Sequence, residues 1–166
     1  EIISGMKASL DSLVSAKGLS LKWDTFPLPE STEGYPSIIN LAVNNLVTNA
    51  VNHAYAEGCG EIRVRIRMLI PDRIEIVVED DGRGIAPREQ KKIFDPFYRD
   101  SMSRQRQEKG SGLGLFLVKR KVLSIGGNLT VESPYRRIDG SRPAGSRFFA
   151  ILPCTTLKND GEESDD

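Results

Sequence analysis

The sequence predicts an α+β fold, a two-layer sandwich in which about three helices cover one face of a mixed sheet of about five strands. Two periodicities lead to this prediction. Apolar residues recur at helical spacing in some segments, and they alternate with polar residues in the shorter segments between. With 166 residues, 39% of them hydrophobic and 28% charged, the chain fits one globular domain with its own core.

The first part of the chain predicts helix, strand, helix. A helix over 2–17, ended by Gly18, is expected from apolar residues at helical spacing: Ile3, Met6, Leu10, Leu13 and Val14. A strand follows over 19–23 and stops before Pro27 and Pro29. The apolar positions from Ser37 to Ala54 then suit a helix with one buried face.

The rest of the chain predicts a hairpin, two further helices and two more strands. Apolar residues at 62–68 alternate with arginines, and 74–78 repeats the alternation after a turn at Pro71-Asp72, so one face should be buried and one wet. A short helix is expected after Pro87, followed by a mobile loop over 99–109. A helix over 113–125 and strands over 128–132 and 147–152 complete the order.

Charge divides the chain into a body and a tail. Lys plus Arg equals Asp plus Glu at 23 each, yet 155–166 holds five acids and one lysine, which leaves a body with 22 basic and 18 acidic residues. We therefore expect a domain over 1–154 and an acidic disordered tail over 155–166. Neither a nucleic-acid partner nor direct membrane contact is expected, since the charge is balanced and no apolar run reaches roughly 18 residues.

Because the chain starts at Glu1, we expect it to be an excised piece of a longer protein, with any membrane anchor in the removed part.

Three asparagines form the first motif. Asn45, Asn49 and Asn52 recur at i, i+4 and i+7 on the second predicted helix, so their side chains share one face. Carboxamides lower helix propensity and are costly to bury, but their oxygens can ligate a hard cation such as Mg²⁺. A solvated polar stripe is the alternative.

The second motif, Asp80-Asp81-Gly82-Arg83-Gly84-Ile85, follows the strand over 74–78. A carboxylate at a strand end can accept a hydrogen bond from an exocyclic amine such as that of adenine, and the glycines let the backbone approach a flat ligand. Taken alone, this segment would be interpreted as a plain Asp-Gly turn.

The third motif, Gly110-Ser111-Gly112-Leu113-Gly114-Leu115, opens the helix over 113–125. Backbone N–H groups at a helix N-terminus bind anions, and glycines let a phosphate come close. The spacing matches neither the dinucleotide fingerprint nor a P-loop, and a flexible hinge is the alternative. Before it lies Ile93-Phe94-Asp95-Pro96-Phe97-Tyr98-Arg99, whose aromatics could pin the loop to the core while Arg99 reaches a phosphate.

In this order, the motifs resemble those of the histidine-kinase branch of the ATPase superfamily shared with gyrase B, Hsp90 and MutL. Asn45 to His53 resembles the N box of that family, Asp80 to Ile85 its G1 box, Phe94 to Arg99 its F box and Gly110 to Leu115 its G2 box. The F box together with the G2 box favours the kinase branch. The resemblance implies ATP and Mg²⁺ as ligands and the Bergerat-type form of the predicted sandwich.

The resemblance also implies catalytic roles for Asn45, Asn49 and Arg99. Asn49 would coordinate the Mg²⁺ that bridges the ATP phosphates, and Asn45 would support the metal and its waters. Arg99 and Lys109 would lie near the phosphates in a mobile ATP lid over about 95–112. Backbone amides would cradle the phosphates at five positions: Gly110, Ser111, Gly112, Leu113 and Gly114.

For the base, the resemblance implies that Asp80 accepts the amino group of adenine. Gly82 and Gly84, followed by Ile85, would let the base lie against the sheet, and His53 would pack near adenine or ribose. One departure concerns Asn52, which stands where many family members carry a Lys or Arg that touches phosphate. Either ATP binds more weakly, or a lid arginine takes over, with Arg104 and Arg106 as the candidates.

His53 is the only histidine of the chain, and its place in the N box is wrong for a phosphoacceptor. The resemblance therefore implies Mg-ATP binding and γ-phosphoryl donation to a histidine on dimerisation helices of the parent protein, which then phosphorylates a response regulator receiver domain. This activity would lie in the cytoplasm. Two alternatives stay open: a serine kinase of the anti-sigma-factor type, and a non-catalytic module that binds nucleotide and acts through partners.

Overall fold

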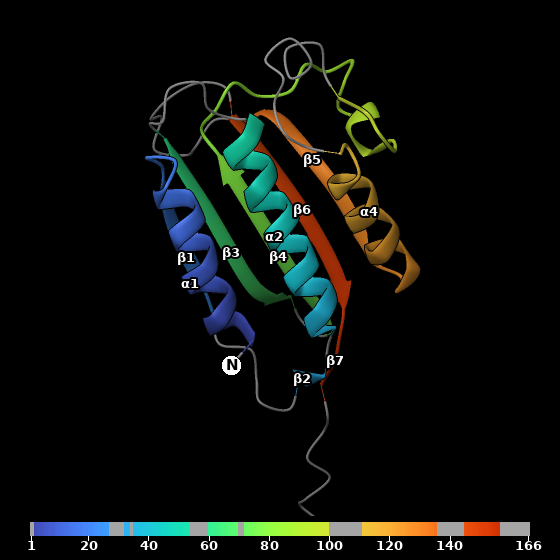
Figure 1. Cartoon of the computed structure of the whole chain (residues 1–166). Helices are drawn as coiled ribbons and strands as arrows, with labels where there is room; N and C mark the ends of the chain where they lie inside the picture. The colour runs from blue at the N-terminus through green and yellow to red at the C-terminus, as the bar shows by residue number, and fades with distance from the viewer. Residues whose placement is uncertain are drawn as a thin grey trace, which may run out of the picture.

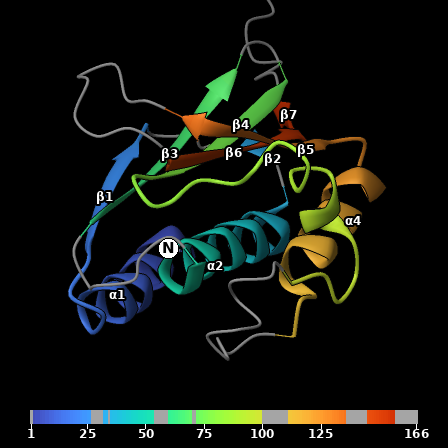
Figure 2. The ribbon, with the colours of Figure 1, turned by 90° about the horizontal axis from the view of Figure 1, so that it is seen from above.

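The computed structural model describes residues 2–26, 32–33, 35–53, 60–69, 72–99, 111–135 and 145–156. Two layers are visible in it (Figures 1 and 2). The helices α1 (Ile2–Ser15), α2 (Pro36–His53) and α4 (Gly114–Ser124) all lie on one face of a five-stranded sheet. The predicted α+β sandwich is thereby confirmed.

The sheet has the strand order β1-β3-β4-β6-β5. Its strands are β1 (Ser20–Thr25), β3 (Glu61–Leu69), β4 (Arg73–Asp80), β5 (Asn128–Tyr135) and β6 (Gly145–Pro153). Only β1 and β3 pair in parallel, and the other neighbours within the sheet pair antiparallel, so the sheet is mixed as predicted. A separate pair joins β2 (Thr32–Glu33) to β7 (Thr155–Thr156), while residues 157–166 of the predicted tail lie outside the described part.

The core lies between the sheet and the helices because each element places its apolar residues on the facing side. On α2 these are Ala42, Val43, Leu46, Val47 and Ala50, all buried. On β4 and β6 the core-facing residues are Ile74, Ile76, Val78, Phe148, Ala150 and Leu152. Asp80 and Ser146 extend the same rows to the end of the sheet, so two polar side chains occupy inward-facing positions there.

The second face of β4 differs from the wet face that the alternation predicts. Glu75, Val77 and Glu79 point away from the helices, yet all three are buried. Long side chains from the neighbouring strands account for this burial: Arg147 lies 2.9 Å from Glu79 and Arg67 lies 2.5 Å from Glu75. The Glu75 carboxylate, as hydrogen-bond partner and as charge, raises the pKa of Arg67. Each buried carboxylate thus has a cationic partner, as burial requires.

The segment after Pro87 contains the expected short helix, but the helix does not begin at Pro87. Turns come first, and the helix is the 3₁₀ helix η1 (Lys92–Phe94). The carbonyl of Ile85 accepts from the side chain of Gln90, and Glu89 N–H donates to the Ala86 carbonyl, so tight turns replace an α-helical ladder here. Within the described ranges, no helix combines the length and apolarity needed to cross a bilayer.

Candidate nucleotide-binding site

The predicted motifs meet at one end of the molecule. The C-terminal end of α2, the C-terminal end of β4 and the N-terminal end of α4 all lie at the top of Figure 1. The segment that follows β4 runs across this end of the sheet to η1, close to the start of α4.

Asn45, Asn49 and Asn52 are half-buried residues of α2, as the helical spacing predicts. The Asn45 amide nitrogen donates to the Leu41 carbonyl one turn earlier, at 2.8 Å. Its side-chain oxygen Oδ1 faces the start of α4, where a Cβ added to Gly114 would lie only 2.7 Å away. The N box and the G2 box are therefore in direct contact, and a side chain at position 114 would displace the Asn45 amide.

Asp80 is the last residue of β4, and only 5% of its surface is exposed. Its cross-strand neighbours are Ile62 on β3 and Ser146 on β6. The carboxylate Oδ1 accepts the Gly82 N–H at 2.9 Å, which fixes the turn that leaves the strand. Asp81, in contrast, turns back to β3 and accepts the Glu61 N–H at 3.0 Å.

The G1 segment is held by residues that the sequence motifs do not contain. Ile85 N–H donates to the hydroxyl of Ser133 on β5 at 2.7 Å, and Gln90 donates to both the Ile85 and the Ser133 carbonyls. Ser133 is buried, as is Ser146 on β6. The signal that could have found them is positional: each serine occupies an inward-facing strand position where an apolar residue is expected.

The F box contains one partly buried aromatic, Phe94, and one exposed aromatic, Phe97. Phe94 packs edge-on against Phe148, with ring centroids 6.5 Å apart, and Lys119 of α4 lies over its ring at 5.3 Å. Lys119 also donates to Asn128 and to the Leu129 carbonyl, and burial lowers its pKa. Phe94 therefore pins this segment to the core, as predicted.

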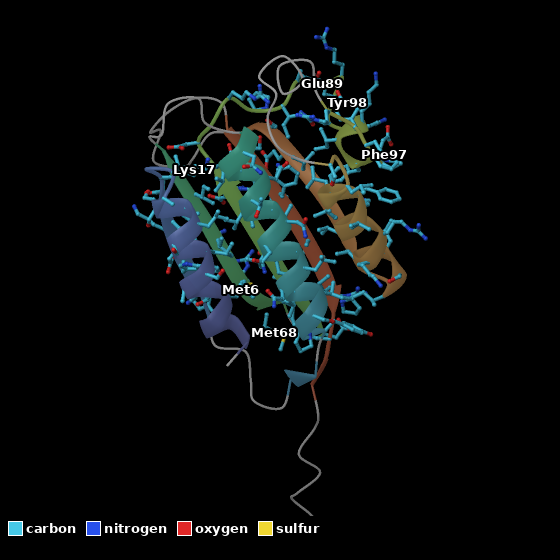
Figure 3. All side chains as sticks on the ribbon, in the orientation of Figure 1. Met6, Lys17, Met68, Glu89, Phe97 and Tyr98 are labelled. Atoms are coloured by element: carbon cyan, nitrogen blue, oxygen red, sulfur yellow. The ribbon has the colours of Figure 1, made fainter. Side chains whose placement is uncertain are left out.

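Phe97 does not pin the segment to the core, because its side chain is 72% exposed beside α4 (Figure 3). Its φ of 62° is costly for a bulky residue. The conformation is held from the G2 box: Phe97 N–H donates to the Gly112 carbonyl at 2.9 Å. Gly112 has a φ of 69°, and an added Cβ would lie 2.8 Å from the Phe97 carbonyl carbon. The two ends of the predicted lid, near Phe97 and Gly112, are therefore in contact.

At the start of α4, Ser111 and Leu113 lie beside Gly112, and the Leu113 N–H donates to the Ser111 hydroxyl at 3.3 Å. The first turn of α4 carries no acidic residue of its own at the positive end of the helix dipole. Arg99 is the last described residue before the gap at 100–110. Lys109 and Gly110 lie outside the described residues, as do Arg104 and Arg106, and His53 is described only as the last residue of α2.

The fold and the site define the class of protein, and residues 34–156 match the family described as histidine kinase-, DNA gyrase B- and HSP90-like ATPases. The chain belongs to this family. It is 35% identical over 144 residues to the signal transduction histidine-protein kinase/phosphatase MprB of Mycolicibacterium paratuberculosis. That alignment covers 87% of this chain but only 26% of the relative, so the chain spans about a quarter of its length.

Solved structures agree with the sequence relatives. A mycobacterial sensor histidine kinase MprB structure superposes with a TM-score of 0.72 and 28% identity, covering 95% of each chain. A full-length ShkA structure in complex with AMPPNP has a TM-score of 0.66 and 23% identity, covering 93% of this chain and 30% of that one. The predicted family, the histidine kinase catalytic domain, is thereby confirmed.

Proposed function

We propose that this domain binds Mg-ATP and donates the γ-phosphoryl group to a histidine of its parent protein in two-component signal transduction. The observation that carries the proposal is the contact between Asn45 and Gly114, which joins the carboxamide stripe of α2 to the N-terminus of α4. The buried residue Asp80 ends β4, and this end of β4 lies at the same end of the molecule. One site can therefore take the phosphates and the base of one nucleotide. The ShkA complex with AMPPNP supports this proposal, since that relative shares the fold.

On the base side, we assign Asp80 as acceptor of the adenine amino group, with Gly82, Gly84 and Ile85 beside the ring. Asp80 is suited to this role because a buried carboxylate forms strong, charge-assisted hydrogen bonds. On the phosphate side, we assign the amides of residues 110–114, together with Arg99, Lys109 and Asn52. We further propose that residues 95–112 form the lid, because its two bases are joined at Phe97 and Gly112.

The asparagines of α2 fit a Mg²⁺ ion. Asn45 donates from its amide nitrogen to the Leu41 carbonyl, so its oxygen is the atom directed at Gly114 at the start of α4. Asn49 lies one turn further along the same stripe and would hold the ion, with Asn45 beside it. When bound, the ion would neutralise charge on the ATP phosphates without a carboxylate ligand.

The reaction needs an acceptor that reaches the γ-phosphate. An unprotonated nitrogen of a neutral imidazole would form a bond to the γ-phosphorus while the bond to the bridging oxygen breaks, and ADP would leave with the electron pair. We assign the imidazole to dimerisation helices of the parent protein. Phe97 and Leu117, two exposed apolar side chains on the α4 side of the site, suit contact with such helices. A receiver domain would then take the phosphoryl group. The need for ATP places this activity in the cytoplasm.

Substitution of Asn49 by alanine is expected to abolish the Mg²⁺ dependence of nucleotide binding, because the substitution removes the proposed metal ligand. Calorimetric titration with ATP, with and without Mg²⁺, measures this dependence. Asn44→Ala is the matched control: it removes the same group from the same helix, but Asn44 donates to the carbonyl of Asn40. A variant at Asn49 whose affinity still rises with Mg²⁺ would disprove the metal assignment.

The isolated domain is expected not to label itself with γ-³²P-ATP, because His53, its only histidine, lies in the N box. Labelling should occur when a matching histidine-bearing helical segment is added, and the label on that segment should be acid-labile. Replacing the acceptor histidine by glutamine in that segment is the control. An acid-stable label on the segment would instead indicate phosphorylation of serine.

A further inference from the structure

The backbone of the G1 segment is held at Ile85 by two side chains. The Ile85 N–H donates to the Ser133 hydroxyl at 2.7 Å, and the Ile85 carbonyl accepts from the Gln90 amide at 3.3 Å. Gln90 also donates to the Ser133 carbonyl. Both backbone polar groups of Ile85 are thus engaged by a closed set of hydrogen bonds among Ile85, Gln90 and Ser133, which we term the Ile85 clamp.

All the hydrogen-bonding positions of the Ser133 hydroxyl are occupied in this arrangement. It donates its one proton to the Gly145 carbonyl at 2.9 Å, and it lies 3.3 Å from the Ser146 hydroxyl. A hydroxyl has one proton and two acceptor positions, so Ser133 accepts from both Ile85 N–H and Ser146. Ser133 and Ser146 are buried, so the loss of one of these hydrogen bonds would leave a buried polar group unsatisfied, at a cost in free energy.

The clamp is connected to the end of β4 that carries Asp80. Ser146 is the cross-strand partner of Asp80, and both side chains lie on the helix-facing side of the sheet. Gly145 packs against the Asp80 backbone so closely that an added Cβ would lie 2.9 Å from the Asp80 carbonyl carbon. Ser133 therefore joins three segments that surround the proposed base-binding position: the G1 segment, β5 and the start of β6.

We propose that Ser133 and Gln90 are positioning residues for nucleotide binding, which hold the G1 segment in its binding conformation before the nucleotide arrives. The inference rests on the proposed function, because it assigns the residues that order the proposed base site. Its physical basis is preorganisation: a segment that is already ordered costs no conformational entropy on binding, whereas a released segment must be ordered by the ligand.

The direct test substitutes Ser133 by alanine and measures two quantities. Hydrogen exchange at the Ile85 amide, followed by NMR, should become faster, while exchange at the β4 amides stays slow. Affinity for ATP, measured by calorimetry, should fall roughly five- to thirtyfold, the effect expected for one or two lost buried hydrogen bonds. Thr130→Ala is the matched control, because Thr130 is exposed on the opposite face of the same strand.

Further variants extend the test, and Gln90→Met keeps it decisive if Ser133→Ala folds poorly. Gln90→Met retains the length of the side chain but removes its donors. Like Ser133→Ala, it should weaken ATP binding. The double variant should lose less affinity than the sum of the two single losses, because both side chains act through Ile85. Ser133→Thr retains the hydroxyl and should restore both the exchange protection and the affinity.

The outcomes separate the inference from the function on which it rests. If unsubstituted protein binds ATP and Ser133→Ala binds it equally well despite faster exchange at Ile85, the inference is overturned and the proposed function stands. If unsubstituted protein binds no adenine nucleotide, the proposed function fails and the inference fails with it. If hydrogen exchange at the Ile85 amide stays slow in Ser133→Ala, the hydrogen bond to Ser133 is not what protects this amide. That result would also overturn the inference.

Discussion

Replacement of Asp80 by asparagine is expected to weaken Mg-ATP binding by roughly ten- to a hundredfold, through loss of a charge-assisted hydrogen bond of about 1.5–3 kcal/mol. The structure sharpens this expectation. The amide oxygen of the variant can still accept the Gly82 N–H, which now donates to Asp80 Oδ1 at 2.9 Å. The NH₂ group then takes the place of the second oxygen and presents donors to the adenine amine, which is itself a donor.

Base selectivity provides the sharper measurement for Asp80→Asn. Guanine carries an acceptor oxygen where adenine carries its amine, so the preference for ATP over GTP should narrow in the variant. Asp81→Asn is the matched control. This substitution removes the same charge one residue later, but the Asp81 side chain accepts from the Glu61 N–H on β3. Unchanged ATP affinity in a folded Asp80→Asn protein would count against the assignment of the base site.

The second large effect is expected for Gly145→Ala. A Cβ at this position would lie 2.9 Å from the Asp80 carbonyl carbon, 3.1 Å from the Asp81 Cα and closer still to the Asp80 carbonyl oxygen. These three nearest atoms all belong to the backbone, so β4 and β6 must separate locally, and this should lower the free energy of unfolding by roughly 2–4 kcal/mol. Thermal denaturation should show a Tm about 5–15 °C lower, and ATP affinity should fall as Asp80 moves.

Gly5→Ala is the control for this substitution, since no atom lies within 4 Å of the added Cβ on α1. Alanine at a helical position should be neutral or stabilise by about 0.5–1 kcal/mol relative to glycine. A Gly145→Ala protein with the stability of the unsubstituted domain would show that the two strands are not held as close as the structure places them.

The sequence predicted most of the secondary structure because helical spacing and strand alternation are local properties. The helix over 37–54 and the hairpin at 62–78 follow directly from them, and the structure places α2 at Pro36–His53 and the hairpin strands at Glu61–Leu69 and Arg73–Asp80. The short helix after Pro87 was expected, but its 3₁₀ form and its start at Lys92 were not, because hydrogen bonds from Gln90 shape the turns that precede it.

The candidate site divides in the same way. Asn49, Asp80 and Gly114 were assigned to the candidate site from sequence, because carboxamides at helical spacing, an acid at a strand end and glycines at a helix start are patterns within short segments. Ser133 and Gln90 were not found, because a serine in a strand and a glutamine in a turn have no local mark of their partners. Their proposed role depends on hydrogen bonds to Ile85, which lies 48 positions from Ser133 and 5 positions from Gln90 in the chain.

By itself, the sequence determined the two-layer fold class, the order of the three helices and five strands that form the two layers, and the family, since each depends on local periodicity and on motifs in a fixed order. Only the tertiary structure decided which groups meet: Asn45 against Gly114, Phe97 against Gly112, and Ser133 against Ile85. It also decided that Phe97 is exposed and that Glu79 is buried with Arg147. These are long-range contacts, and residues distant in the chain acquire them only when helices and strands pack.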